Sequence, residues 1–441
     1  MPAAAAVRRP ATIPIKRGSS HDLRCRALAI VAPVLTVTRL FAKVPRADGA
    51  AAWQLGPVGL NALAIVGWSV WLALIVFRAT QIDLARVTDP DSSGFAMYMR
   101  YAARLWRGES LYDPADLHGF HYLPAMLIAL RPVLDVDPLI AGRVFGIASV
   151  IAYSGAIAAL AWSIWPRRWA AASGAILGLG SFAVIPAFIL LNAQLVMTAA
   201  LIAATVAMMR ERWWIASAFI AIAIVIKPLS IVFALLAGAA FVRIRLAMCV
   251  ALAAALLAPF ALFDWTYVAG EYANYVHKMW GISAAPPGQW PFQVDISTLF
   301  ASLGLELPPL ARLVIRAGAA LVTLAMALRV ARTGDAPAAG FAVLILSGLY
   351  ITLFNPRNED VSFLVVIPAI LAIALAPLDR DLKDWRGWLW FILLAALLVR
   401  RGIATERWLK PAALVLAYGG LASLVIRPDC WRRWMFGPRA G

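Results

Sequence analysis

The sequence predicts an all-α polytopic membrane protein with about twelve transmembrane helices. Hydrophobic residues make up 63% of the 441 positions, and the mean hydropathy of +0.80 is far above that of soluble domains. They gather in long runs, and the first, residues 58–77, is long enough to cross about 30 Å of hydrocarbon. The 40 lysine and arginine residues flank these runs instead of forming one basic module, which argues against nucleic acid as a partner.

The first unit, residues 1–57, is a basic tail that we place in the cytoplasm. Its apolar stretch, residues 27–38, is short for a signal peptide, and no small-residue cleavage site follows it. The tail would lie on the anionic inner leaflet. A start codon placed too far upstream explains the segment equally well. The alanine-rich composition, with only 6 lysines among the 40 basic residues, suggests a bacterial inner membrane.

The second unit, residues 58–426, is a transmembrane domain in which apolar runs alternate across the bilayer, with both chain ends inside. The predicted crossings are 58–77, 139–165, 170–191, 195–209, 213–226, 229–242, 247–263, 310–330, 341–354, 361–376, 388–399 and 412–426. The second outer loop, 264–309, carries one basic residue against four acidic ones, whereas the inner turns are basic. Residues 427–441 form a cytoplasmic tail. The weakest assignments are 122–130 and 388–399, which are short enough to be re-entrant.

The first outer loop, residues 81–124, is the longest polar interval between apolar runs. Residues 91–93 are typical helix caps and Gly108 is a typical stop, so we predict a helix over residues 94–107. We expect this helix to lie flat on the membrane, with its apolar stripe among the acyl chains and its arginines at phosphate level. The apolar stripe is Phe95, Tyr98, Ala102 and Leu105, and the basic stripe is Arg100, Arg104 and Arg107.

Asp91 lies at the N-terminus of this predicted helix. The helix dipole and the free N–H groups would keep its carboxylate ionised, which suits a base that faces a sugar hydroxyl beside a lipid. The alternative is that Asp91 only caps the helix. Asp89-Pro90-Asp91 has the form of a metal-binding DxD motif. The intervening proline and the nearby cations argue against a metal.

Further polar motifs fall on the predicted outer side. Lys227 stands beside a proline between two runs of about fourteen residues, which places it within the bilayer thickness in a protein-lined cavity. The alternative is a lysine that snorkels to the surface. Asn192 and Gln194 could instead satisfy freed helix ends, and Arg357 with Glu359 could be a structural ion pair. The sequence has no glycine-rich phosphate loop, HExxH or CxxC motif, so an activated sugar would have to be lipid-linked.

These motifs together resemble those of membrane glycosyltransferases with the GT-C fold, and most closely glycosyltransferase family 87, the polyprenol-phosphate-mannose-dependent mannosyltransferases. An Asp usually stands about four residues before the tyrosine that aligns with Tyr98, whereas this chain has Gly94 there. The base would then be Asp91 or Asp89. The matching residues are Tyr98, Ala102, Gly108, Leu111, Tyr112, Asp113, Pro114, Tyr122, Pro124, Asn192, Gln194, Lys227, Pro228, Asn355, Pro356, Arg357 and Glu359.

The resemblance implies transfer of a hexose, expected to be mannose, from a polyprenyl-phosphate donor to an extracytoplasmic lipid or glycan acceptor, with inversion at C1. We expect no cofactor and no metal. The two rival hypotheses are a flippase or transporter and a non-catalytic assembly protein of the envelope. We assign substrate contacts to Lys227, Arg357, Glu359, Arg100, Arg104, Tyr98, Tyr122, Asn192, Gln194, His277 and Trp290.

Overall fold

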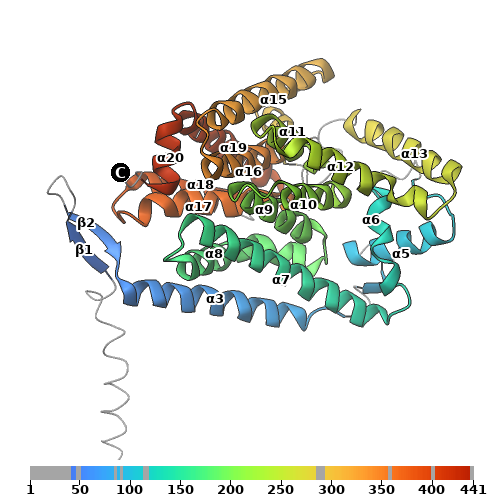
Figure 1. Ribbon diagram of the computed structural model, residues 1–441, viewed down its shortest axis with the longest axis horizontal. Helices are drawn as coiled ribbons and strands as arrows, with labels where there is room; N and C mark the ends of the chain where they lie inside the picture. Colours follow the sequence, from blue (N-terminus) through green and yellow to red (C-terminus); the bar gives the residue numbers. More distant parts are fainter. Residues whose placement is uncertain are drawn as a thin grey trace, which may run out of the picture.

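The computed structural model describes residues 41–45, 51–83, 87–89, 93–112, 119–284, 294–355, 360–398 and 403–437. Helices dominate these residues, as predicted (Figure 1). One antiparallel hairpin, formed by β1 (Phe41–Pro45) and β2 (Ala51–Leu55), lies within the segment expected to be a tail. The two strands have only five residues each, and the sequence analysis did not predict them.

Seven helices in the described part of the chain are long and apolar enough to cross a membrane, and this is a multi-pass membrane protein. They are α3 (Pro57–Ala79), α7 (Pro138–Ile164), α8 (Trp169–Ile189), α12 (Ile244–Leu257) continued by η3 (Ala258–Ala261), α15 (Pro309–Ala331), α16 (Ala336–Phe354) and α19 (Ile403–Val425).

Five apolar helices are shorter. They are α9 (Gln194–Met209), α10 (Trp213–Ile226), α11 (Ile231–Ala240) preceded by η2 (Pro228–Ser230), α17 (Ile367–Leu378) and α18 (Trp385–Leu398). The number of twelve crossings stays a prediction. The segment 122–130 contains only the five-residue helix α6 (Pro124–Ile128), which is too short to span a bilayer.

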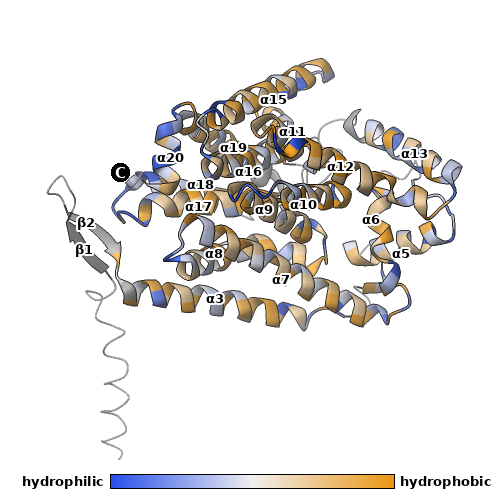
Figure 2. Ribbon diagram, viewed as in Figure 1, coloured by the Kyte–Doolittle hydropathy of each residue, from blue (hydrophilic) through white to orange (hydrophobic). Residues whose placement is uncertain are grey.

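The remaining elements connect or cover the bundle. They are α5 (Gly94–Trp106), η1 (Arg131–Val133), α13 (Trp265–Ala284), α14 (Ile296–Ser302), η4 (Asp360–Val365) and α20 (Pro428–Phe436). Figure 1 shows α5, α6 and α13 together at one end of the bundle, and α20 with the hairpin at the other. Below, these are called the α5 end and the α20 end. In Figure 2 apolar colours cover the bundle helices, and hydrophilic colours gather at its two ends.

The first crossing packs closely on α8 because glycines face each other. A Cβ atom at Gly67 would lie 2.2 Å from the carbonyl oxygen of Gly174. The two backbones therefore touch, which is the usual way for membrane helices to gain van der Waals contact without a hydrophobic driving force. The opposite face of α3 carries exposed apolar side chains such as Ile65, as expected for a surface that contacts lipid.

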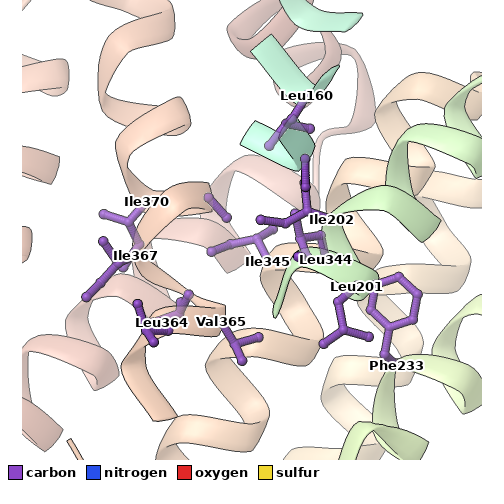
Figure 3. Close-up of a cluster of buried hydrophobic side chains, with 14 of the residues drawn as sticks. Leu160, Leu201, Ile202, Phe233, Leu344, Ile345, Leu364, Val365, Ile367 and Ile370 are labelled. Carbon is purple, nitrogen blue, oxygen red and sulfur yellow. The ribbon is translucent and has the colours of Figure 1, made fainter. Parts of the chain in front are cut away.

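The core lies where α7, α9, α16, η4 and α17 meet (Figure 3). Leu201, Ile202, Leu344 and Ile345 from α9 and α16 are fully buried. Ile370 from α17 closes the same cluster. Nearly all residues of α16 and α17 are buried, which places both helices in the centre of the bundle and not at its lipid-facing rim.

Candidate functional site

The helix predicted in the first outer loop is present as α5. Its observed N-cap is Ser93, whose Oγ accepts the Ala96 N–H at 3.2 Å. Gly108 ends it with φ +69°, a backbone conformation that favours glycine. Asp91, the predicted base, lies outside the described residues. Asp89 is exposed at the entry to the helix.

The expectation that the apolar stripe of α5 faces acyl chains is wrong. Phe95, Tyr98, Ala102 and Leu105 are at most 1% exposed because other parts of the protein cover them. The helix is docked on the turn after α8, where the Gly94 N–H donates to the Leu190 carbonyl oxygen at 2.8 Å. An amphipathic stripe requires an apolar partner, and here the bundle supplies it.

The basic stripe of α5 points away from this packed face. Arg100 is exposed. Arg107 donates from Nε to Glu109 at 2.5 Å, and Arg104 lies 3.7 Å from the same carboxylate. The hydrogen bond from Arg107 lowers the pKa of Glu109. Two of the three predicted phosphate-level arginines therefore face a carboxylate.

A polar chain runs from α5 into the bundle through Tyr98, Tyr122, Gln194 and Lys227. The Tyr98 hydroxyl donates to the Tyr122 hydroxyl at 3.2 Å and accepts the Ala193 N–H, also at 3.2 Å. Their rings meet edge to face with centroids 5.2 Å apart. The first outer loop is thereby tied to the turn between α8 and α9.

Lys227 completes this polar chain. The ammonium Nζ donates to the Gln194 side-chain oxygen at 2.9 Å. Asn192 accepts the Gln194 N–H at 2.9 Å, which confirms that it satisfies a freed helix end. The lysine backbone is extended, with φ −145° and ψ 104°, because Pro228 ends the helical run between α10 and η2. Lys227 is half-buried, and Gln194 is 2% exposed.

Two hydroxyls near this polar chain have no partner. Thr198 follows Gln194 by one helical turn, and Ser230 follows Lys227 by three residues. Both side chains are fully buried, and neither hydroxyl makes a hydrogen bond in the part of the chain that the structure describes. Buried polar groups are usually satisfied, so this interior suits a polar ligand group better than a sealed core does.

The chain also matches a known protein family. The model of glycosyltransferase family 87 matches residues 120–356, more than half of the chain. The chain belongs to glycosyltransferase family 87. It is therefore a multi-pass membrane glycosyltransferase. A comparison with curated proteins finds no match.

The family 87 match includes the two inner members of the polar chain, Gln194 and Lys227, and also Tyr122. It begins after α5, so Asp89, Asp91 and Tyr98 precede it. The structure thus adds Tyr98 to the matched region through contact in space. Arg357, Glu359 and Trp290 lie outside the described residues. His277 is exposed on α13, and within the described segments no hydrogen bond joins it to the polar chain.

The glycosyltransferase has a further element at the α5 end that the sequence did not predict, the helix α13 inside the loop 264–309. Glu271, only 4% exposed, accepts the Leu111 N–H at 2.8 Å. Tyr267 donates its hydroxyl to the Glu109 carbonyl oxygen at 2.7 Å. Two hydrogen bonds therefore fasten α13 to the end of the first outer loop.

Burial on this surface changes the pKa of several phenols. It raises the pKa of Tyr267 and of Tyr272 to about 12. Tyr112 donates to the Tyr122 carbonyl oxygen at 2.5 Å, and its pKa is raised well above the ordinary value, first by burial and then by the nearby Tyr275 and Glu271. These phenols stay protonated at neutral pH and act as hydrogen-bond donors.

Three more charged groups of the glycosyltransferase are buried although the sequence did not single them out. Lys278 on α13 is 1% exposed, and Lys410 on α19 is 2% exposed, 5.6 Å above the Phe363 ring. Asp295 is fully buried; it caps α14 and lies 3.6 Å from Arg316. A sequence signal for Lys278 does exist. It follows Glu271 by seven residues, which places both side chains on the same face of a helix.

No metal centre is evident in the described ranges, where no three His, Cys, Asp or Glu side chains come together. Whether the glycosyltransferase uses a metal therefore rests on the sequence argument alone. The described cations near the α5 end, such as Lys227 and Lys278, are the groups that could face an anionic substrate.

Proposed function

We propose that this glycosyltransferase moves a hexose, with mannose as the first candidate, from polyprenyl phosphate to a lipid or glycan acceptor at the extracytoplasmic face. The polar chain from Tyr98 to Lys227 carries the proposal. It leads from the acidic first outer loop to an ammonium group inside an apolar bundle. A charged lysine at such depth is costly without a role.

The donor phosphate is assigned to Lys227. The Gln194 side-chain oxygen accepts a hydrogen bond from the ammonium at 2.9 Å and so orients it. When the hexose leaves, the polyprenyl phosphate gains negative charge at the broken bond, and a cation fixed in a low-dielectric site stabilises that charge strongly. Arg357, which follows the end of α16 closely in the sequence, is the second cation we assign to this phosphate.

The proton transfer is assigned to Asp91, with Asp89 as the alternative. The acceptor hydroxyl oxygen forms a bond to C1 from the face opposite the phosphate. Its proton passes to the carboxylate, while the C1–O bond to the phosphate breaks and its electron pair leaves with the polyprenyl phosphate. One such displacement inverts the configuration at C1.

The docked position of α5 supports this division of roles. Its N-terminus is held at the α8–α9 turn by the bond between Gly94 and Leu190, and Gln194 begins the next helix. We assign the base to Asp91, three residues before the start of α5, and expect it to act beside the segment that positions Lys227. In the donor, C1 is bonded directly to an oxygen of the phosphate. The base and Lys227 therefore act on the two sides of one carbon–oxygen bond.

The test uses the full chain in lipid nanodiscs with synthetic polyprenyl-phosphate mannose and an extract of membrane lipids as the acceptor. Asp91→Asn should lower transfer at least about a hundredfold and leave donor binding nearly unchanged, because only the proton acceptor is lost. Lys227→Gln should weaken donor binding by about 10- to 150-fold, the effect of losing one charge-assisted contact.

Two controls accompany these variants. Arg332→Gln removes an exposed cation at the α20 end and should behave as wild type. Polyprenyl-phosphate glucose in place of the mannose donor tests the choice of hexose. Full activity in both Asp91→Asn and Asp89→Asn would remove the base assignment. Movement of the lipid across the bilayer without any sugar transfer would replace the proposed reaction by flipping.

A further inference from the structure

Two adjoining hollows lie at the α20 end, on the far side of the bundle from the polar chain. Their volumes are about 340 and 520 Å³. Trp162 and Arg210 line both of them, so the two hollows adjoin between the ends of α7 and α9, and together they are called the groove below. Ala158, Ala159 and Trp169 line one part, and Ser163, Pro166, Met209 and Pro337 line the other.

Arg210 is the charged group of this groove. It is exposed and donates from Nη2 to the Ser163 hydroxyl at 3.3 Å, which fixes its guanidinium beside the opening. Within the described ranges it has no carboxylate partner, whereas Arg168, Arg243 and Arg432 at the same end each pair with an acidic side chain. Arg210 therefore retains its charge and hydrogen-bonding capacity for an external anion.

The walls of the groove are apolar and face the position of lipid. Trp162 is 51% exposed, and its ring centroid lies 5.8 Å from that of Trp169. Tryptophan pairs of this kind are typical of the membrane–water boundary, where an amphipathic ring meets head groups. Ala158 and Ala159 continue the groove along α7, away from Arg210, with a lining of small apolar side chains.

We propose that this groove binds one anionic phospholipid, with its phosphate on Arg210 and an acyl chain over Ala158 and Ala159. The cation selects a negatively charged head group, and the tryptophans cover the glycerol region. A soluble phosphate would use Arg210 but gain nothing from the apolar wall, so the structure favours the lipid as the source of the phosphate.

The proposed lipid site shares one element with the polar chain. Gln194 is the first residue of α9, and Arg210 caps the other end of the same helix. The proposal concerns binding only, so it stands or falls separately from the hexose-transfer reaction. The bound lipid would be a structural ligand at the α20 end of the molecule.

The experiment is native mass spectrometry of the full chain in detergent, titrated with phosphatidylglycerol, phosphatidylcholine or glycerol 3-phosphate. Wild type should retain phosphatidylglycerol in preference to phosphatidylcholine and should not retain glycerol 3-phosphate. Arg210→Gln should weaken phosphatidylglycerol binding about tenfold or more and abolish the preference. Arg332→Gln, which removes an exposed arginine outside the groove, is the matched control and should bind as wild type.

Ala158→Phe gives a second, independent variant, because it fills the groove and leaves Arg210 in place. It should also weaken retention of phosphatidylglycerol. Equal retention of the two phospholipids by wild type, or unchanged binding in Arg210→Gln, would overturn the proposal. Binding of glycerol 3-phosphate as tightly as the lipid would identify a free-anion site instead.

Discussion

Glu271→Ala removes the carboxylate that joins α13 to the first outer loop. The bond that disappears is the one from the Leu111 N–H to Oε2, 2.8 Å long and formed between residues 160 positions apart. Both partners are buried, Glu271 being 4% and Leu111 1% exposed. Water cannot easily replace the lost acceptor in this position, so the N–H is left unpaired.

The size of the effect follows from that geometry. A hydrogen bond to a charged group contributes about 1.5–3 kcal/mol, and an unpaired buried donor costs a similar amount. Local opening of the loop should then become about 10- to 150-fold more frequent. Glu271→Gln keeps an acceptor oxygen at nearly the same place and should lose much less, since only the charge disappears.

Hydrogen exchange followed by mass spectrometry measures this opening directly. The peptide that contains residues 109–112 should exchange faster in Glu271→Ala, while peptides from α16 should not change. Glu306→Ala, an exposed acidic residue of the same outer segment, is the matched control. Unchanged exchange in Glu271→Ala would mean that aromatic packing, such as that of Tyr112 on Phe120, holds the loop without the carboxylate.

Two further predictions concern packing and pH. Gly67→Val should separate α3 from α8 and lower the thermal unfolding temperature, because its Cβ would overlap the Gly174 carbonyl; normal stability would contradict the backbone contact. Tyr267 and Tyr272, with pKa values raised by burial to about 12, should ionise late in an absorbance titration. Their raised pKa values favour the folded state fully below about pH 10, and this stabilisation is lost between about pH 10 and 12. Each variant, Tyr267→Phe or Tyr272→Phe, loses the absorbance change of one phenol. If the lost change lies near pH 10, the raised pKa values are refuted.

Local chemistry predicted α5 and the break at Lys227 well. Serine before an apolar stripe and a glycine after it determine the ends of a helix whatever surrounds it. Proline beside Lys227 interrupts the backbone hydrogen bonds in any environment. Both features depend on neighbouring residues only, and both are present in the structure.

The surroundings of α5 could not be predicted in the same way. A stripe of apolar residues has the same spacing whether it faces lipid or protein. The periodicity therefore predicts the helix and its apolar face, but not the partner that covers this face. The backbone bond from Gly94 to Leu190 decides between the two partners. It joins segments almost a hundred positions apart, and no local pattern encodes that distance.

The helix α13 was missed for a different reason. Its buried face carries Glu271 and Lys278, whereas sequence reasoning expects charges on the exposed face of a helix. In the sequence, Glu271 and Lys278 therefore look like charges of a polar loop. A helix that covers a polar site has polar partners on its inward face. It therefore lacks the apolar stripe by which an amphipathic helix is recognised in a sequence.

The arrangement of broken and unbroken helices favours transfer over transport. The chain is interrupted at Leu191, which has φ +46°, at Lys227 and at η4. The helix α9 packs against η4 and contacts Lys227 through Gln194. Below Gln194, α9 continues through fully buried Leu201 and Ile202 into the sealed apolar core of Figure 3. A flippase needs a polar path through the bundle for its sugar or phosphate. In the described part of the chain the polar groups near Gln194 end on that apolar core, which supports the proposed transfer between a donor and an acceptor on the same side of the membrane.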